Sequence, residues 1–164
     1  KLPAHDIGSF MKGKIRSFGV SDDFFMYDQS SAARVGIYYY ENGAYPRKPK
    51  VIYDRNHSSF FSLDIDEIPE EVYTASKCFH TTGITLALNG DIRETTIEMI
   101  KRFKAAGTLV SFDVNFRGNL WTGDQARECI LRILPHLHRS LHPENRPQPQ
   151  TPHLWLCDIR CCKG

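Results

Sequence analysis

The fold is decided by residues 91–113, which read DIRETTIEMIKRFKAAGTLVSFD. Residues 91–106 have apolar side chains at helical spacing, and Asp91 followed by Glu94 is typical of a helix start. Glu94 is expected to reach back to the first backbone N–H groups of this helix. The buried face is expected to consist of Ile92, Met99, Phe103 and Ala106. Gly107 then ends the helix, and Leu109–Asp113 is predicted to be a short strand.

Strand and helix alternate on both sides of this stretch. Lys77–His80 is a short apolar strand, and Thr122–Gln125 has the capping-box pattern that opens a helix carrying Ala126, Cys129, Ile130 and Ile133. This order is typical of an α/β fold, with a parallel sheet, a right-handed crossover and helices on the sheet faces. Ligands of such sheets bind beyond the carboxyl ends of the strands, which here are Thr81–Gly83 and Asn115–Arg117.

The first third of the chain predicts a helix followed by a pair of strands. Apolar residues recur at helical spacing after Asp6, a candidate N-cap, and Gly19 stops the helix; they are Ile7, Phe10, Met11, Ile15 and Phe18. Arg34–Glu41 and Lys50–Arg55 are rich in β-branched and aromatic residues. We expect these two segments to form an antiparallel pair joined by an open loop.

The composition excludes several classes of protein. The 164 residues carry 21 basic and 19 acidic side chains, a net charge of +2, which gives no broad basic surface for nucleic acid or membrane. No apolar run approaches the ~20 residues of a membrane span, and the N-terminus lacks the apolar run of a signal peptide. Five cysteines, an odd number, favour a reducing, cytoplasmic setting. The missing initial Met suggests a chain cut from something longer.

The most informative segment for chemistry is 110–121, VSFDVNFRGNLW. The apolar strand there is followed by an amide (Asn115), an aromatic ring (Phe116) and a guanidinium (Arg117), at the position where a ligand is expected. The planar fork of arginine donors suits carboxylate or phosphate oxygens. The alternative is structural: Arg117 pairs with Asp113 or Asp124, and Trp121 only packs. The residues alone leave both interpretations open.

A second group of candidates lies on the predicted strand pair. Tyr38, Tyr53, Asp54 and Arg55 combine phenolic hydroxyls, a carboxylate and a second guanidinium for an acidic ligand. The alternative is an ordinary exposed sheet face with cross-strand aromatic pairs.

The last part of the chain, 138–164, differs from the rest. Four prolines between Pro143 and Pro152 are incompatible with a helix or strand, and no apolar strand follows the helix at Gln125. His153, Cys157, Cys161 and Cys162 could be zinc ligands, but their spacing lacks a C-x2-C pair, so no metal site is predicted. We expect this tail to be disordered or the product of a frameshift near Leu137.

Segments of the chain resemble the ribokinase-like (PfkB-type) carbohydrate kinases, and 2-keto-3-deoxygluconate kinases above all. The similar segments, in order, are VGIYYYE (35–41), VIYDR (51–55), FHTTGITLAL (79–88) and SFDVNFRGNLW (111–121). The opening HDIGSFM (5–11) is similar to a helix found in these enzymes generally. The resemblance extends over residues 1–137, which would be the central part of the kinase domain, with lid strands at about 34–55.

The resemblance implies a partial Rossmann-like sheet with a small β lid, and transfer of the γ-phosphoryl group of ATP, with Mg²⁺, to a keto-deoxy sugar acid. Tyr38 and Tyr53–Arg55 would contact the substrate. Arg117 would hold the substrate, at its carboxylate, and Asn115 would lie toward the nucleotide phosphates, in a segment that includes Phe116. Lid strands of such kinases often pair, so a homodimer is a further expectation.

The sequence departs from the family where catalysis is concerned. In such kinases, the general base and the anion-binding helix N-terminus come from a G-x-G-D motif. This motif does not occur in the 164 residues. The chain is therefore expected to be inactive alone. Two further hypotheses stay open: a kinase of a neutral sugar such as fructose or ribose, and a non-catalytic module that binds a sugar acid or dimerises.

Overall fold

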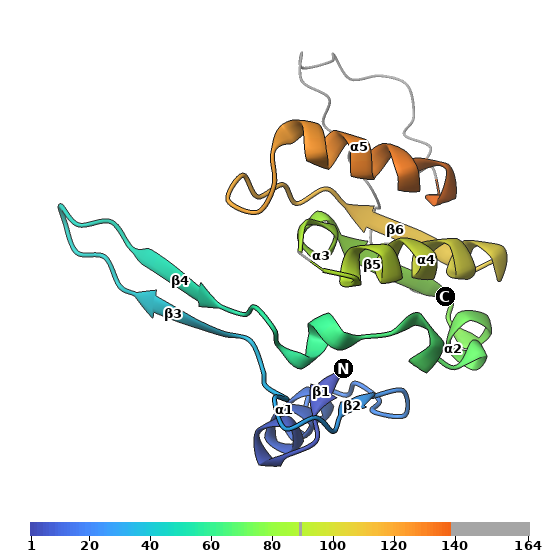
Figure 1. Ribbon diagram of the computed structural model, residues 1–164, viewed down its shortest axis with the longest axis horizontal. Coiled ribbons are helices and arrows are strands. Elements are labelled where there is room, and N and C mark those ends of the chain that lie inside the picture. The colour runs from blue at the N-terminus through green and yellow to red at the C-terminus, as the bar shows by residue number, and fades with distance from the viewer. Residues whose placement is uncertain (89, 139–164) are drawn as a thin grey trace. The chain divides into compact units, whose positions relative to one another are not determined.

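A computed structural model describes residues 1–88 and 90–138 of the chain (Figure 1). The chain divides into two compact units, one from Lys1 to Ile68 and one that begins at Pro69. The proline-rich, cysteine-rich tail predicted for 138–164, with its four candidate zinc ligands, lies outside the described residues except for His138.

The second unit is built on a parallel pair of strands, as predicted. β5 (Cys78–Thr82) and β6 (Leu109–Asp113) pair in register from Cys78 opposite Leu109 to Thr82 opposite Asp113. The predicted strand 77–80 thus begins one residue later and continues through Thr82. The described part of this unit has four α-helices, α2 (Glu70–Ala75), α3 (Gly83–Ala87), α4 (Ile92–Ala105) and α5 (Gly123–Ile133), and a short 3-10 helix, η3 (Leu134–His136). Figure 1 shows β5 and β6 side by side, and α4 contacts β6.

The core of this unit lies between one face of the strand pair and the helices. Alternation along the strands places Phe79, Val110 and Phe112 on the same face. The Phe79 ring stacks on Phe103 of α4 with 4.2 Å between ring centroids, and Val110 and Phe112 are almost completely buried. Burial of these side chains on one face holds helix and sheet together.

The buried face of α4 differs from the predicted one. Ile92 and Phe103 are buried as expected, but Ala106 is exposed, and Met99 is only partly covered. Ile97 and Ile100 complete the apolar core of the helix instead. Residues three and four positions apart share a helix face, so the stripe through Ile100 and Phe103 is the one that meets the strands.

The predicted start of α4 is also wrong in its detail. Asp91 occupies the N-cap position but makes no side-chain capping bond. Glu94 does not reach back to the backbone; its two carboxylate oxygens accept hydrogen bonds of 2.8 and 2.5 Å from Arg132 of α5. This ion pair holds the pKa of Glu94 below its usual range, mainly through the hydrogen bond from Arg132.

The capping box predicted for α5 is confirmed. The Thr122 hydroxyl accepts a hydrogen bond from the Gln125 backbone N–H at 3.2 Å, and the Gln125 side chain accepts one from the Thr122 backbone N–H at 2.8 Å. Ala126, Cys129 and Ile133 are buried, as the sequence predicts, whereas Ile130 is partly exposed. Beyond α5, the His138 backbone N–H donates to the Val110 carbonyl at 3.3 Å, so the chain returns alongside β6.

The two helix starts give a matched stability test. We expect Thr122→Ala to lower the free energy of unfolding by about 1 kcal/mol, because the Gln125 backbone N–H loses the hydroxyl that accepts its hydrogen bond. Asp91→Ala is the control and should change it by less, since Asp91 makes no capping bond. Chemical denaturation followed by circular dichroism measures both variants. Equal losses in the two variants would contradict the assigned cap.

The first unit begins with a short parallel pair and a helix. β1 (Leu2–Pro3) pairs with β2 (Tyr27–Asp28), and α1 spans Asp6–Arg16. The N-cap of α1 is His5 rather than the predicted Asp6: the His5 ring accepts a hydrogen bond from the Ile7 backbone N–H. Gly19, the predicted stop, has a φ of 81°, a conformation that favours glycine.

The predicted apolar face of α1 is not buried. Ile7 is 54%, Phe10 74% and Phe18 75% exposed. The helix meets β1 through Gly8 instead, since a Cβ at this position would lie 1.9 Å from the Pro3 carbonyl oxygen. A small residue is therefore required at Gly8 for the helix and β1 to approach each other.

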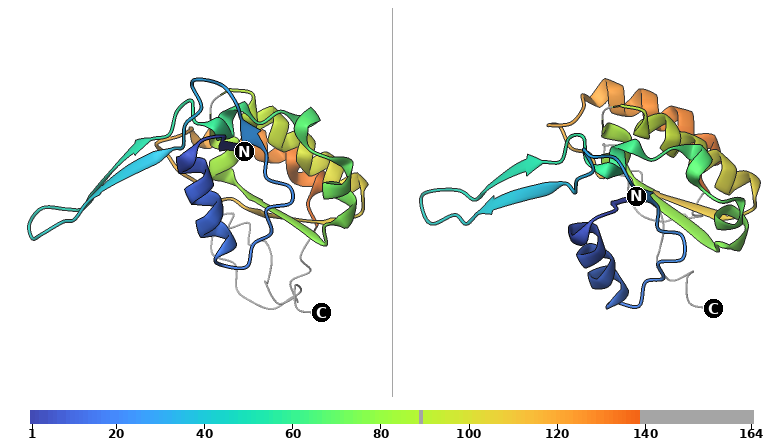
Figure 2. Two further views of the ribbon diagram at one scale, coloured as in Figure 1. Left: turned by 90° about the horizontal axis from the view of Figure 1, so that it is seen from below. Right: turned by 60° about the horizontal axis from the view of Figure 1, so that its bottom comes forward.

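The predicted antiparallel strand pair is confirmed as a hairpin. β3 (Ile37–Glu41) and β4 (Lys50–Asp54) pair from Ile37 opposite Asp54 to Glu41 opposite Lys50, shorter by a few residues than predicted. Both faces of the hairpin are exposed, and in the views of Figure 2 it extends away from α1. Two 3-10 turns, η1 (Ser59–Ser62) and η2 (Ile65–Glu67), then complete the first unit.

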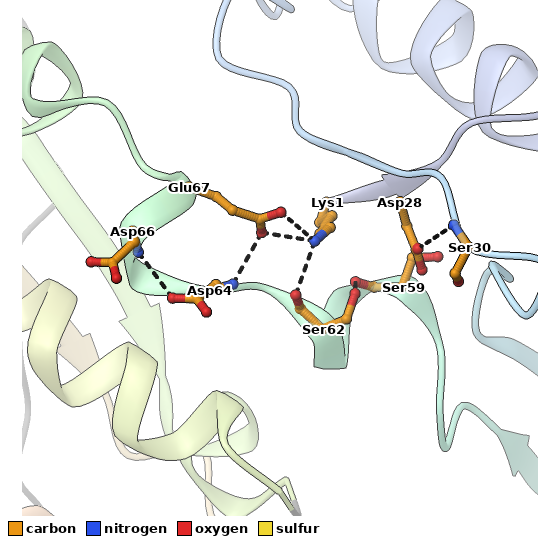
Figure 3. Close-up of polar contacts among 8 residues, drawn as sticks. All are labelled: Lys1, Asp28, Ser30, Ser59, Ser62, Asp64, Asp66 and Glu67. Carbon is orange, nitrogen blue, oxygen red and sulfur yellow. Dashed lines mark hydrogen bonds and ion pairs between the residues drawn. The ribbon is translucent and has the colours of Figure 1, made fainter.

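A polar network ties these turns to β1 (Figure 3). The Lys1 ammonium donates to the Ser62 carbonyl oxygen at 3.0 Å and forms an ion pair of 2.5 Å with the Glu67 carboxylate. Glu67 also closes a capping box with Asp64. The segment that follows the hairpin is thus fixed at both of its turns.

Candidate functional site

The two strand ends that the sequence nominated meet within the second unit. Gly83 follows directly on β5, and a Cβ at this position would lie 2.0 Å from the carbonyl oxygen of Val114 in the loop after β6. The same Cβ would lie 3.5 Å from the Trp121 ring. The backbone after one strand therefore packs directly on the backbone after the other, which places the loop 114–121 at the carboxyl edge of the sheet.

The loop presents Arg117 with its donors largely free. Arg117 is exposed, and its guanidinium donates one hydrogen bond, to the Phe116 carbonyl oxygen at 3.3 Å. Within the described residues it forms no ion pair with Asp113 or Asp124. The structural alternative for Arg117 is thus not observed, and the guanidinium can bind an external anion.

Asn115 and Asp113 shape this loop. Asn115 has a φ of 34°, in the left-handed region that asparagine tolerates better than most residues. Its backbone N–H donates to the Asp113 carboxylate at 3.0 Å. The carboxylate at the end of β6 is thus engaged by the turn, and Phe116 remains 46% exposed.

Trp121 packs, as the structural interpretation predicted. The side chain is only 4% exposed, and its indole nitrogen is buried without a hydrogen-bond partner among the described residues. The Trp121 ring lies near Gly83, so it packs between the end of the loop and the residue that follows β5.

The candidates on the hairpin separate into two faces. Tyr38 and Tyr53 lie directly opposite each other, with 6.4 Å between ring centroids. The Arg55 guanidinium lies 4.8 Å from the centroid of the Tyr53 ring, a distance typical of a cation–π contact. Tyr38, Tyr53 and Arg55 therefore form one cluster, which we call the tyrosine–arginine cluster.

Asp54 points to the other face of the hairpin. Its side chain shares that face with Ile37, and its carboxylate forms an ion pair of 2.6 Å with Arg34. The hydrogen bond from Arg34 holds the pKa of Asp54 below its usual range. The sequence did not single out Arg34, because its partner lies across the hairpin root and no local pattern marks such a pair.

The chemistry of each group, taken by itself, suits an anionic, hydroxyl-rich ligand. Each group offers an arginine, the side chain that binds carboxylate and phosphate through two parallel hydrogen bonds. The tyrosine hydroxyls add donors and acceptors for neutral oxygens.

Comparison with known proteins agrees with this chemistry. The chain is 36% identical over 135 residues to 2-dehydro-3-deoxygalactonokinase from Haloferax volcanii, an alignment that covers 82% of the chain and 42% of that protein. The crystal structure of 2-dehydro-3-deoxygluconokinase from Thermotoga maritima superposes with a TM-score of 0.74 at 31% identity, over 83% of the chain and 41% of that structure. The chain is a relative of the PfkB-type carbohydrate kinases.

The PfkB-type relatives are much longer than the matched segment, since the chain spans about two fifths of their length. No protein-family model matches the chain. The ribokinase-like fold is shared more widely: a fructokinase from Xylella fastidiosa with bound ATP has a TM-score of 0.68 at 23% identity, over 83% of the chain and 41% of that structure. The predicted resemblance to the PfkB-type kinases and the predicted α/β ribokinase-like fold are confirmed.

Among residues 1–88 and 90–138, no three His, Cys, Asp or Glu side chains gather closely enough to hold a metal ion. In the same residues, no helix has the length and apolar character to cross a bilayer. Burial raises the pKa of the Cys129 thiol.

Proposed function

We propose that the chain is the lid and central-sheet segment of an ATP-dependent kinase that phosphorylates a keto-deoxy sugar acid, such as 2-keto-3-deoxygluconate (2-dehydro-3-deoxygluconate). The proposal rests on the exposed guanidinium of Arg117 at the carboxyl edge of the sheet, which forms no ion pair within the described residues. The printed names of the Haloferax volcanii and Thermotoga maritima relatives support the same substrate class.

In this proposal the chain's own residues bind and orient the substrate. In the second unit, Arg117 binds the sugar-acid carboxylate. In the first unit, the tyrosine–arginine cluster offers Arg55 as a second cation and the hydroxyls of Tyr38 and Tyr53 for sugar oxygens. Asp54, which the sequence grouped with them, acts through its ion pair with Arg34. Asn115 and Phe116 lie toward the nucleotide phosphates, next to Arg117.

The reaction itself needs more than these residues. The terminal hydroxyl oxygen of the sugar acid forms a bond to the γ-phosphorus of ATP, the bond from that phosphorus to the β–γ bridging oxygen breaks, and the hydroxyl proton passes to a base. The G-x-G-D motif that supplies this base in the family is absent from the 164 residues. The described residues also lack a cluster that could hold Mg²⁺ by itself, so no step is assigned to the metal.

A direct test is binding without turnover. Isothermal titration of the 164-residue chain is expected to show 2-keto-3-deoxygluconate binding at least about tenfold more tightly than fructose, because only the acid engages a guanidinium fork. The same chain with ATP and the sugar acid should yield no phosphorylated product. Equal affinity for fructose would favour a neutral-sugar kinase, in line with the fructokinase fold relative. Phosphorylated product would refute the predicted inactivity.

A homodimer through the hairpin is part of the same proposal. Ile37, Tyr39 and Ile52 form an exposed apolar face opposite the tyrosine–arginine cluster. A second copy of the chain could cover this face. Light scattering distinguishes a dimer from a monomer, and a monomer at all concentrations would exclude this arrangement.

A further inference from the structure

The root of the hairpin is held by one side chain that contacts both neighbours of Arg55. Arg34 lies three residues before β3, and its guanidinium forms the 2.6 Å ion pair with the Asp54 carboxylate. The same guanidinium donates to the Asn56 carbonyl oxygen at 3.2 Å and to the Asp54 carbonyl oxygen at 3.4 Å. These contacts lie immediately before and immediately after Arg55 in the sequence.

The backbone of Arg34 is anchored in turn. Its N–H donates to the Ser59 hydroxyl at 3.1 Å, and its carbonyl oxygen accepts from the Ser59 backbone N–H at 2.8 Å. Ser59 is only 2% exposed, and its own carbonyl oxygen accepts from the Ser62 hydroxyl at 3.0 Å. Figure 3 shows Ser59 and Ser62 joined in this way, with Lys1 bound to Ser62.

The network continues to β2. Hydrogen bonds from Ser30, and then one from the Ser59 hydroxyl, hold the pKa of the Asp28 carboxyl below its usual range. Arg34 is therefore tied through Ser59 to the body of the first unit, while its side chain holds the end of β4.

The strand that follows Arg34 also runs against Arg55. A Cβ at Gly36 would lie 3.0 Å from the Cβ of Arg55 and 3.4 Å from its Cα. The backbone of Arg55 thus lies close to Gly36, and the residues before and after Arg55 are both held by Arg34. The guanidinium of Arg55 lies over the Tyr53 ring.

We propose that Arg34 is a positioning residue of the sugar-acid site: it fixes the Asp54–Asn56 turn, and so sets where the hairpin presents the Arg55 guanidinium. This inference rests on the proposed function, because Arg55 must contact the substrate for its position to matter. It also explains why Asp54 faces away from the tyrosine–arginine cluster: the carboxylate holds Arg34 rather than the ligand.

The hairpin offers a matched control. Arg47 forms an ion pair with Glu41 near the tip and also donates to the Asn42 carbonyl oxygen at 3.2 Å. It therefore makes the same kinds of contact as Arg34, on the same hairpin, without contacting the neighbours of Arg55.

The test compares binding of 2-keto-3-deoxygluconate by the 164-residue chain and its variants in isothermal titrations. Arg34→Ala and Asp54→Asn are each expected to raise Kd roughly tenfold, as is usual when a charge-assisted contact is lost from its proper geometry. The Kd of Arg34→Lys should lie between that of these two variants and that of the parent chain, because lysine keeps the positive charge but not the planar fork of donors. Arg47→Ala should leave Kd unchanged.

The outcomes separate the inference from the proposed function. If the parent chain does not bind the sugar acid, or Arg55→Ala binds it equally well, the site assignment fails and the inference with it. If Arg55→Ala weakens binding but Arg34→Ala and Asp54→Asn match Arg47→Ala, the inference alone is overturned. Thermal unfolding of each variant guards against misfolding: the expected result is a Kd loss with a melting temperature no lower than that of Arg47→Ala.

Discussion

Arg117→Ala is expected to weaken binding of 2-keto-3-deoxygluconate roughly 100-fold, the largest change from any single truncation at the proposed site. Its guanidinium is exposed and makes a single hydrogen bond among the described residues, to the Phe116 carbonyl oxygen. Most of its donors are therefore available to a carboxylate, and alanine removes all of them together with the positive charge. Isothermal titration of the 164-residue chain gives the ratio of dissociation constants directly.

Two comparisons make this result specific. Arg117→Lys keeps the charge but loses the planar fork, so an intermediate loss of about tenfold is expected. Arg127→Ala removes an exposed arginine from α5, within the same unit, and should leave the affinity unchanged. The same variant should unfold at the same temperature as the parent chain. Unchanged binding by Arg117→Ala would remove the carboxylate contact on which the proposed substrate depends.

Local patterns in the sequence predicted the elements that are held by local contacts. The capping box at Thr122 and Gln125 involves residues three positions apart, and it forms as expected. The hairpin and the strand Leu109–Asp113 follow from β-branched and aromatic side chains, and both are present. In each case the stabilising partner lies nearby in the sequence or on the next strand.

The predictions failed where a distant partner outcompeted the local one. Glu94 was expected to cap its own helix, but it pairs with Arg132, which lies 38 residues further along the chain. Arg34 carried no local signal, since its partner Asp54 is 20 residues away across the hairpin root. A charged side chain goes to the partner that the tertiary fold supplies, and spacing along the sequence does not reveal that partner.

The helix α1 shows a second kind of failure. Its apolar residues have the right period, and the helix forms, but Phe10 and Phe18 remain exposed in the first unit. Periodicity predicts which residues share a face; it does not predict whether the chain supplies a surface to cover that face. Gly8, which the pattern ignored, is the residue that contacts β1.

The position of the candidate site in the second unit was predictable from the order of strands and helices. The rule that ligands bind at the carboxyl ends of parallel strands nominated Thr81–Gly83 and Asn115–Arg117, and the structure brings these two segments together. The rule could not show that this contact requires glycine at position 83, where no side chain separates the two backbones.

Gly83→Ala is expected to lower the free energy of unfolding by about 3 kcal/mol, because the added methyl group has no room. The new Cβ would lie 2.0 Å from the Val114 carbonyl oxygen and 3.0 Å from the carbonyl carbon, and both are backbone atoms that no rotamer change can move aside. Either the loop after β6 or the start of α3 must shift. Because this loop carries Arg117, the sugar-acid affinity should fall together with the stability.

Gly123→Ala is the matched control, since Gly123 also begins a helix in the same unit. Apart from its chain neighbours and the backbone of its own helix, no described atom lies within 4 Å of the added Cβ. Alanine there should leave stability within about 1 kcal/mol of the parent chain, and its higher helix propensity acts in the stabilising direction. Chemical denaturation of both variants distinguishes the cost of the backbone clash from the effect of helix propensity. Isothermal titration of both variants with the sugar acid measures the change in affinity. A Gly83→Ala variant as stable as Gly123→Ala would mean that the two strand ends do not touch, and the edge that presents Arg117 would lose its physical basis.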